Sequence, residues 1–447
     1  MKKRVVAMLT VVTLLAGLSA GCAKTGGQDG GSGNAGKTDK EAVTLNVILS
    51  ENEQTKDMLN YFDQFEEETG IKINYEIMAE SSYMDKMMLG LSSNNQQYDV
   101  VMASPATIGT ILDGGWVQPL DQYIEDDSVT DKAWREGLAD SMLSLAVVDG
   151  KRYAVPYNMG VNILYYNKAM FRDAGLDPEN PPTTLEDILK AARTLNAPDK
   201  NQYGISFRAS REGNANTFLW AMLWMICGGS WEDAEGLVDY SRIGGKEAVE
   251  ATDFFAEFHE YAPAGISSYG YEEAQLAFQQ GLSAMWIDTS ILANGVLDSE
   301  ESQVAEDVGF AAFTEGHAIG SPWMFLMASK TEHPTEAWKF LQFVSGYELQ
   351  MEQVKSGVQT GPVRTDVLGD PKIGEYFNED LAEAVNYALE HDPISNYFPA
   401  INEMTEIRSL LAIQIADVAL GKTDSQSAID QLWKDVEELL KREGVIE

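Results

Sequence analysis

The stretch GLSAGC (residues 17–22) carries the pattern that most directly suggests catalysis. Its first five residues match G-x-S-x-G, the turn that presents the nucleophilic serine of α/β-hydrolases. That turn requires a strand before the serine and a helix after it. Ser19 instead follows an apolar run and precedes a glycine-rich tract. The flanking sequence therefore argues against an esterase nucleophile at this position.

The residues before Cys22 are typical of a bacterial export signal. A basic start at residues 2–4 precedes an apolar run over residues 5–18, which is shorter than the roughly 20 residues of a membrane-spanning helix. LSAGC (18–22) resembles the lipobox, where cleavage leaves cysteine as a lipidated N-terminus. We therefore expect a lipoprotein signal peptide over residues 1–21. Acyl chains on Cys22 would then hold the mature protein stably to the membrane.

Residues 22–42 are predicted to form a flexible linker, because this segment is rich in glycine and almost devoid of apolar side chains. A G-x-G-x-x-G match within it lacks the strand and helix that a dinucleotide site requires. The chain carries 70 acidic against 32 basic residues, which argues against a nucleic-acid partner. Its four histidines and two cysteines show no metal-ligand spacing, so neither a metal nor a cofactor is expected.

The rest of the chain alternates strand-like and helix-like segments. Residues 42–49, 71–78 and 98–103 read as strands, and residues 52–70 between the first two carry apolar side chains at helical spacing. This alternation predicts an α/β domain with a mostly parallel sheet. Residues 282–288 and 307–313 read as further strands.

Six sequence blocks in a fixed order resemble the family 1 extracellular solute-binding proteins, the carbohydrate-binding lipoproteins of ABC importers, which include the maltodextrin-binding proteins. The resemblance covers about residues 43–440. The blocks are FEEETGIKINYE, YDVVMASPATIGTILDGGWVQPLD, YAVPYNMGVNILYYNKAMFRDAGLDPENPPTTLEDILKAA, AFQQGLSAMWIDTS, GSPWMFLMASKTEHPTEAWKFLQFVS and GVQTGPVRTDVL.

The resemblance implies a two-lobed periplasmic-binding-protein type II fold with a ligand cleft between the lobes. Residues 43–158 with 314–364 would form the N-lobe, and residues 162–310 with 366–447 the C-lobe. The chain would cross between lobes near 158–162, 310–314 and 362–366. Closure around a ligand would then be a hinge motion.

The resemblance, together with the rule that ligands sit at the carboxyl ends of strands in open α/β sheets, implies a set of ligand-binding candidates. Several have a structural alternative: Asn52 as a helix cap, Trp220 on a buried helix face, Trp323 in the core and Arg408 on the surface. The candidates are Glu51, Asn52, Ser104, Asn158, Asn216, Trp220, Asp288, Trp323, Arg364 and Arg408.

We therefore expect a non-enzymatic, monomeric receptor on the extracytoplasmic face of a bacterial cell membrane. It would capture a carbohydrate, with an oligosaccharide expected, and deliver it to an ABC transporter permease. A binding protein for a non-sugar solute is the alternative. An extracellular glycosidase is a weaker one, since it needs two carboxylates about 5 to 9.5 Å apart and no short motif nominates such a pair.

Overall fold

The computed structural model describes residues 42–93, 95–138, 143, 147–148, 150–235, 237–315, 322–391, 397–399 and 401–447. The expectations for the signal peptide, for lipidation at Cys22 and for most of the linker lie outside these residues. No helix in these ranges is long and apolar enough to cross a membrane.

One sheet has five strands in the order β2-β1-β3-β10-β6. β1 is parallel to both β2 and β3, whereas β10 is antiparallel to β3 and β6. The strands are β1 (Thr44–Ser50), β2 (Lys72–Met78), β3 (Val100–Ala103), β6 (Ala154–Asn158) and β10 (Trp323–Met327). The helices in the same part of the chain are α1 (Glu53–Met58), α2 (Phe62–Thr69), α3 (Glu80–Ser92), α4 (Pro105–Asp113), α5 (Asp121–Ile124), α6 (Lys132–Glu136), α14 (Pro334–Val344), α15 (Tyr347–Lys355) and α16 (Thr365–Leu368). A two-stranded ribbon pairs β4 (Val147–Val148) with β5 (Lys151–Arg152).

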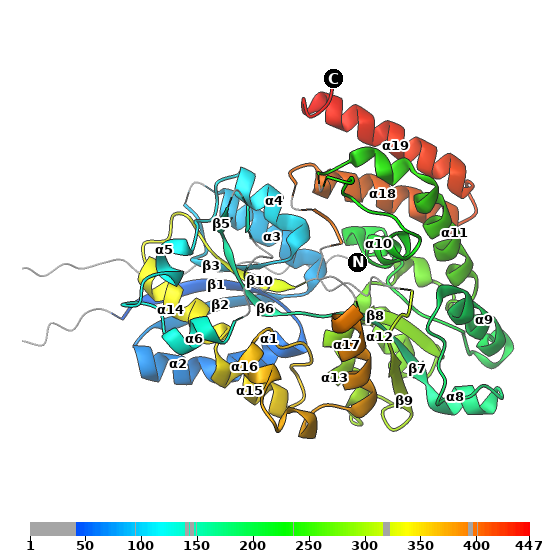
Figure 1. Ribbon diagram of the computed structural model, residues 1–447, viewed down its shortest axis with the longest axis horizontal. Helices are drawn as coiled ribbons and strands as arrows, with labels where there is room; N and C mark the ends of the chain where they lie inside the picture. The colour runs from blue at the N-terminus through cyan, green and yellow to red at the C-terminus, as the bar shows by residue number, and fades with distance from the viewer. Residues whose placement is uncertain are drawn as a thin grey trace, which may run out of the picture. The chain divides into compact units, whose positions relative to one another are not determined.

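The second sheet places β7 between β8 and β9, and both pairings are antiparallel. Its strands are β7 (Asn162–Asn167), β8 (Met285–Thr289) and β9 (Val308–Ala311). Among its helices, the red α19 runs beside α18, which in turn packs on α10 and α11 (Figure 1). The helices are α8 (Lys168–Asp173), α9 (Leu185–Leu195), α10 (Asn216–Ile226), α11 (Lys246–Glu260), α12 (Tyr271–Gln279), α13 (Ala293–Leu297), α17 (Glu379–His391), α18 (Met404–Ala419) and α19 (Ser425–Arg442).

The mostly parallel sheet predicted from the sequence does not describe this second sheet, in which both pairings are antiparallel. β7 enters it three residues after β6 leaves the first sheet, and its partners β8 and β9 lie far from it in the sequence. The alternation of neighbouring segments therefore does not determine the direction of these pairings.

Each sheet has its own hydrophobic core. One core uses buried side chains from residues 45–159 and 324–363. The other uses residues 161–313 and 381–440. The chain is therefore two-lobed: the first lobe contains the core of residues 45–159 and 324–363, and the second lobe contains the core of residues 161–313 and 381–440. The lobe boundaries proposed from the sequence stay a prediction.

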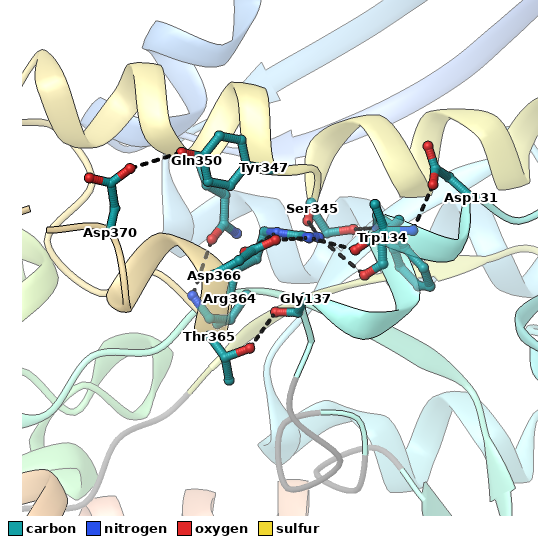
Figure 2. Close-up of polar contacts among 12 residues, drawn as sticks. Asp131, Trp134, Gly137, Ser345, Tyr347, Gln350, Arg364, Thr365, Asp366 and Asp370 are labelled. Atoms are coloured by element: carbon teal, nitrogen blue, oxygen red, sulfur yellow. Dashed lines mark hydrogen bonds and ion pairs between the residues drawn. The ribbon is translucent and has the colours of Figure 1, made fainter.

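Arg364, a ligand-binding candidate from the sequence, is almost fully buried in the first lobe, with 1% of its side chain exposed. Its guanidinium donates to the carbonyls of Ala133, Trp134 and Ser345 at 3.1–3.3 Å. It also binds Asp366 through both carboxylate oxygens, at 2.9 and 2.6 Å. Figure 2 shows this guanidinium among α6, the end of α14 and the start of α16. In this position Arg364 holds three helices together.

Arg364→Met should therefore lower the free energy of unfolding by about 3 kcal/mol, because three buried carbonyls lose their donor and Asp366 loses its partner. Chemical denaturation measures this change. Arg442→Met is the matched control, since Arg442 pairs with Glu406 on the surface at 2.8 Å and its removal should leave stability close to wild type. Equal effects of the two substitutions would contradict the packing role of Arg364.

Candidate functional site

A buried ion pair between Arg208 and Asp288 forms the centre of the candidate site. Asp288 is the fourth residue of β8 and is completely buried, and Arg208 has 12% of its side chain exposed. Arg208 Nε and Nη2 donate to Asp288 Oδ2 and Oδ1 at 2.9 and 2.7 Å. Burial alone would lower the pKa of the guanidinium, but the charge and hydrogen bonds of Asp288 raise it above its usual range. Arg208 therefore stays protonated at physiological pH.

Side chains from both lobes surround this guanidinium. Nη1 lies 3.7 Å from Oε2 of Glu80, the first residue of α3 in the first lobe. The ring centroids of Phe218 and Tyr271 lie 4.3 and 5.2 Å from the guanidinium carbon, close enough for cation–π attraction. The Tyr271 hydroxyl also donates to the carbonyl of Glu51 at 3.2 Å. Arg208 is therefore fixed where the two lobes meet.

Two buried polar atoms beside this pair have no hydrogen-bond partner within the described residues, the hydroxyl of Tyr397 and Oδ1 of Asn162. Both residues are at least 95% buried. Burial and the charge of Asp288 raise the pKa of the Tyr397 hydroxyl, which therefore remains protonated. The Asn162 side chain lowers the pKa of the same hydroxyl, yet no hydrogen bond of normal geometry joins the two side chains. Such unpaired buried groups are rare and call for a partner, and a ligand hydroxyl would be one.

A cavity of about 280 Å³ opens beside Tyr271 and is lined by residues of both lobes. Glu51 and Asn52 line one side, and Glu272 and Gln275 line the other. Burial raises the pKa of Glu272, and the neighbouring charges of Glu273, Glu80 and Glu51 add to this effect. Carboxylates and amides are the groups that bind sugar hydroxyls, so the lining suits a polar solute.

Three candidates from the first lobe lie at strand ends, as the sequence predicted. Asn52 caps α1, because its side chain accepts from the Thr55 amide at 2.9 Å, which is the structural alternative. Glu51 is partly exposed and pairs with Lys56 at 3.2 Å. Ser104 precedes α4 without capping it through its side chain, so its hydroxyl remains available.

Asn158 and Trp323 meet where β6 and β10 pair. Asn158 is fully buried, donates to Gln54 and accepts from the Trp323 amide. Its side chain is therefore used within the protein. Trp323 is partly exposed and packs edge-on against Tyr83, with ring centroids 6.2 Å apart. Trp323 thus keeps part of its surface open to a ligand, and that role stays a prediction.

Three candidates lie on α10 and α18. Trp220 is fully buried, stacks on Trp224 at 5.6 Å and donates to Thr252 at 2.8 Å; it therefore packs in the core. Asn216 is also buried and donates to the Ala412 carbonyl at 2.8 Å. Arg408 is partly exposed instead, and its contacts link it to the central pair.

Arg408 donates through Nε and Nη2 to the Thr217 hydroxyl at 3.2 Å and stands 4.7 Å over the ring of Phe398. Burial lowers the pKa of this guanidinium to about 10, with Glu80 raising and Arg208 lowering it. Arg408 therefore lies within electrostatic reach of Arg208 and Glu80. Arg364 lies elsewhere, in the helix network described above.

The sequence analysis missed Arg208, Glu80, Tyr271 and Tyr397. Glu80 was within reach, since it closely follows β2 and the strand-end rule that nominated Glu51 applies to it equally. Arg208 gave no such signal, because its extended segment joins β8 only through an isolated bridge between Ser206 and Trp286. No group of three or more potential metal ligands occurs in the described part of the chain.

Comparisons with known proteins agree with this picture. The family model for bacterial extracellular solute-binding proteins matches residues 50–351. The mannitol-binding protein of Pseudomonas aeruginosa is 29% identical over 293 residues, which is 64% of each chain. The erythritol/L-threitol-binding protein of Mycolicibacterium smegmatis is 24% identical over 73% of this chain and 71% of its own.

Solved structures share the fold. An ABC transporter solute-binding protein from Agrobacterium radiobacter K84, in complex with ribitol, superposes with a TM-score of 0.78 at 22% identity, covering 89% of this chain and 99% of its own. One from Agrobacterium vitis S4 with bound D-mannitol gives 0.74 at 23% identity, covering 90% and 99%. The two-lobed periplasmic-binding-protein fold expected from the sequence is thereby confirmed.

Proposed function

This chain belongs to the bacterial extracellular solute-binding proteins, and from that premise we propose that it captures a small polyol or sugar and delivers it to the permease of an ABC transporter. The family and its relatives are binding proteins, so the chain is not an enzyme and the glycosidase alternative falls. The relatives named for mannitol and for erythritol and threitol support a hydroxyl-rich ligand.

The observation that carries this proposal is the Arg208–Asp288 pair beside unpaired polar atoms. The guanidinium is fixed by a bidentate bond and by two aromatic rings. The Tyr397 hydroxyl and Asn162 Oδ1 offer a donor and an acceptor that make no hydrogen bond of normal geometry within the described residues. A polyol hydroxyl both donates and accepts, so it can satisfy both groups without introducing a charge into the site.

Contacts between the lobes favour a short ligand over the expected oligosaccharide. The Tyr271 hydroxyl meets the Glu51 carbonyl at 3.2 Å, and the hydroxyls of Thr110 on α4 and Thr405 on α18 lie 3.4 Å apart. These contacts tie one lobe to the other at two places. A ligand of monosaccharide size fits between such contacts more readily than an extended chain. The oligosaccharide expectation gains no support from them.

Delivery requires the protein to stay at the membrane that holds its permease. We propose that Cys22 carries the lipid, that residues 1–21 are removed, and that the mature protein acts as a tethered monomer on the extracytoplasmic face. The lipobox-like LSAGC motif supports the anchor. The family, which is extracellular, supports the location.

Ligand binding should be detectable as a gain in stability. At 100 times its dissociation constant, a ligand adds roughly 2.7 kcal/mol to the free energy of unfolding. We expect such a gain from at least one of D-mannitol, ribitol, erythritol, L-threitol, D-tagatose and maltose in a thermal-shift screen, confirmed by calorimetric titration. Stabilisation by amino acids, peptides or polyamines, with every sugar and polyol silent, would favour the non-sugar alternative.

A substitution at Gly109 tests whether the contact between α4 and α18 belongs to the ligand-bound state. A Cβ atom at Gly109 would lie 2.7 Å from the backbone carbonyl of Ile401, so Gly109→Ala must push α4 away from the segment that leads into α18. We expect the affinity for the ligand found in the screen to fall by about tenfold, because closure then costs more. The helix itself should not be weakened, since alanine is a better helix former.

Gly374→Ala is the control, because a Cβ there meets nothing within 4 Å. Unchanged affinity in Gly109→Ala, measured by the same calorimetric titration, would show that the α4–α18 contact is not part of the bound state.

The anchor has a direct test in cells. Cys22→Ala should abolish incorporation of labelled palmitate and leave an uncleaved precursor, because cysteine is both the cleavage signal and the acylated residue. Cys227→Ala is the matched control, since Cys227 is the second cysteine of the chain. Continued labelling of Cys22→Ala would refute lipidation at this residue.

A further inference from the structure

We propose that Asp288 and Glu80 make this site select uncharged polyols and sugars over the corresponding acids, with Asp288 as the main residue that sets the selectivity. The inference rests on the proposed function, because it concerns which members of the sugar and polyol class the same site accepts.

The formal charges at the centre of the site balance, while further carboxylates line the adjoining cavity. The centre contains two guanidinium groups, Arg208 and Arg408, and two carboxylates, Asp288 and Glu80. Arg408 bonds to Thr217, and the ring of the next residue, Phe218, lies against Arg208. The four groups therefore form one electrostatic set whose formal charges cancel. An added ligand charge would leave this set unbalanced in a partly dehydrated space, which is costly.

Arg208 is not free to bind an anion. An unpaired guanidinium recognises a carboxylate or phosphate with two parallel N–H donors. Asp288 already occupies Nε and Nη2 of Arg208, at 2.9 and 2.7 Å, and the Thr289 amide donates to Asp288 Oδ1 at 2.8 Å. A ligand carboxylate would have to displace a fully buried carboxylate or lie against it, and like charges in contact are strongly unfavourable.

The negative charge of Glu80 offsets the positive charge of Arg408, the second guanidinium group of the site. Arg408 takes part in no ion pair among the described residues, and its Nε and Nη2 both donate to the neutral Thr217 hydroxyl. Glu80 stands 3.7 Å from Arg208 Nη1 and raises the pKa of Arg408. Removal of either carboxylate should therefore give the site a net positive charge and favour an acidic ligand.

The cavity beside the site adds to the same preference. Its lining includes Glu51, Glu53, Glu272 and Glu301 against the single base Lys56. The side chains that line this cavity carry a net negative charge, which lowers the local concentration of anions.

The experiment compares D-mannitol with D-mannonate, and ribitol with D-ribonate, by calorimetric titration of the purified protein. Each pair shares a carbon chain and differs by one terminal carboxylate. We expect the wild-type protein to bind the polyol of a pair about 100-fold more tightly than the acid. Asp288→Asn should remove or reverse this preference, and Glu80→Gln should reduce it by about tenfold.

Glu67→Gln is the matched control, because it removes the same charge from an exposed position on α2 and should leave the ratio unchanged. Thermal unfolding reports whether Asp288→Asn still folds. Glu80→Gln keeps the test decisive if it does not, because the Glu80 side chain is 37% exposed.

The outcomes separate the two proposals. Equal wild-type affinity for a polyol and its acid, or wild-type ratios in both Asp288→Asn and Glu80→Gln, would overturn the charge selectivity and leave the proposed function standing. Failure of the wild-type protein to bind any sugar or polyol of the panel would overturn the proposed function, and the charge selectivity with it.

Discussion

The passage of one chain between two hydrophobic cores is the constraint on which the rest of the structure depends. Each crossing carries backbone N–H and C=O groups that must remain hydrogen-bonded where they are buried. The Met159 amide donates to the Gly361 carbonyl at 2.8 Å, and the Ser290 amide donates to the Val161 carbonyl at 2.7 Å. Such close approach needs glycine, because a Cβ at Gly361 would lie 1.9 Å from the Met159 carbonyl oxygen. Residues 159–161, which join β6 to β7, are therefore hydrogen-bonded to segments of both lobes.

A buried set of amide side chains connects these crossings to the rim of the cavity. Gln54, in the first turn of α1, donates to Gln359 at 3.2 Å and accepts from Asn158. Gln353 donates to the Gln54 carbonyl at 2.8 Å, and the Trp323 amide donates to Asn158. A fully bonded buried network of this kind specifies one arrangement of its members. The amide side chains that hold the end of β6 thus also hold the start of α1 in place. Glu51 and Asn52, just before α1, line the cavity.

The sequence predicted those secondary-structure elements that depend on the pattern of apolar and polar residues along a short segment. The segments 42–49 and 71–78 correspond to β1 (Thr44–Ser50) and β2 (Lys72–Met78), since alternation is a property of neighbouring residues. The fold followed from six ordered blocks. The antiparallel pairing of β7 was not predictable in this way, because its partners β8 and β9 lie far from it in the sequence.

Side-chain roles were predictable only where position along a strand decides them. Asp288 was nominated as a ligand contact because its strand end should approach the cleft; it bonds to Arg208, and its contact with a ligand stays a prediction. Arg364 and Arg408 both looked like arginines near a cleft. One ties three helices together through backbone carbonyls, and the other stands over Phe398 beside the site. That difference arises from contacts with residues distant in the sequence, which a single chain without an alignment does not reveal.

Tyr271 joins the charge of the site to the closure of the lobes. Its ring lies 5.2 Å from the Arg208 guanidinium carbon, its side chain lines the cavity, and its hydroxyl meets the Glu51 carbonyl across the lobe boundary. Burial raises the pKa of this hydroxyl, and the charges of Glu272 and Glu80 add to the effect, so it stays a hydrogen-bond donor throughout the physiological range. A solute that fills the cavity therefore packs against a residue that already bridges both lobes. Binding energy gained there would favour the arrangement in which Tyr271 bridges the two lobes, and a population shift requires such differential contact.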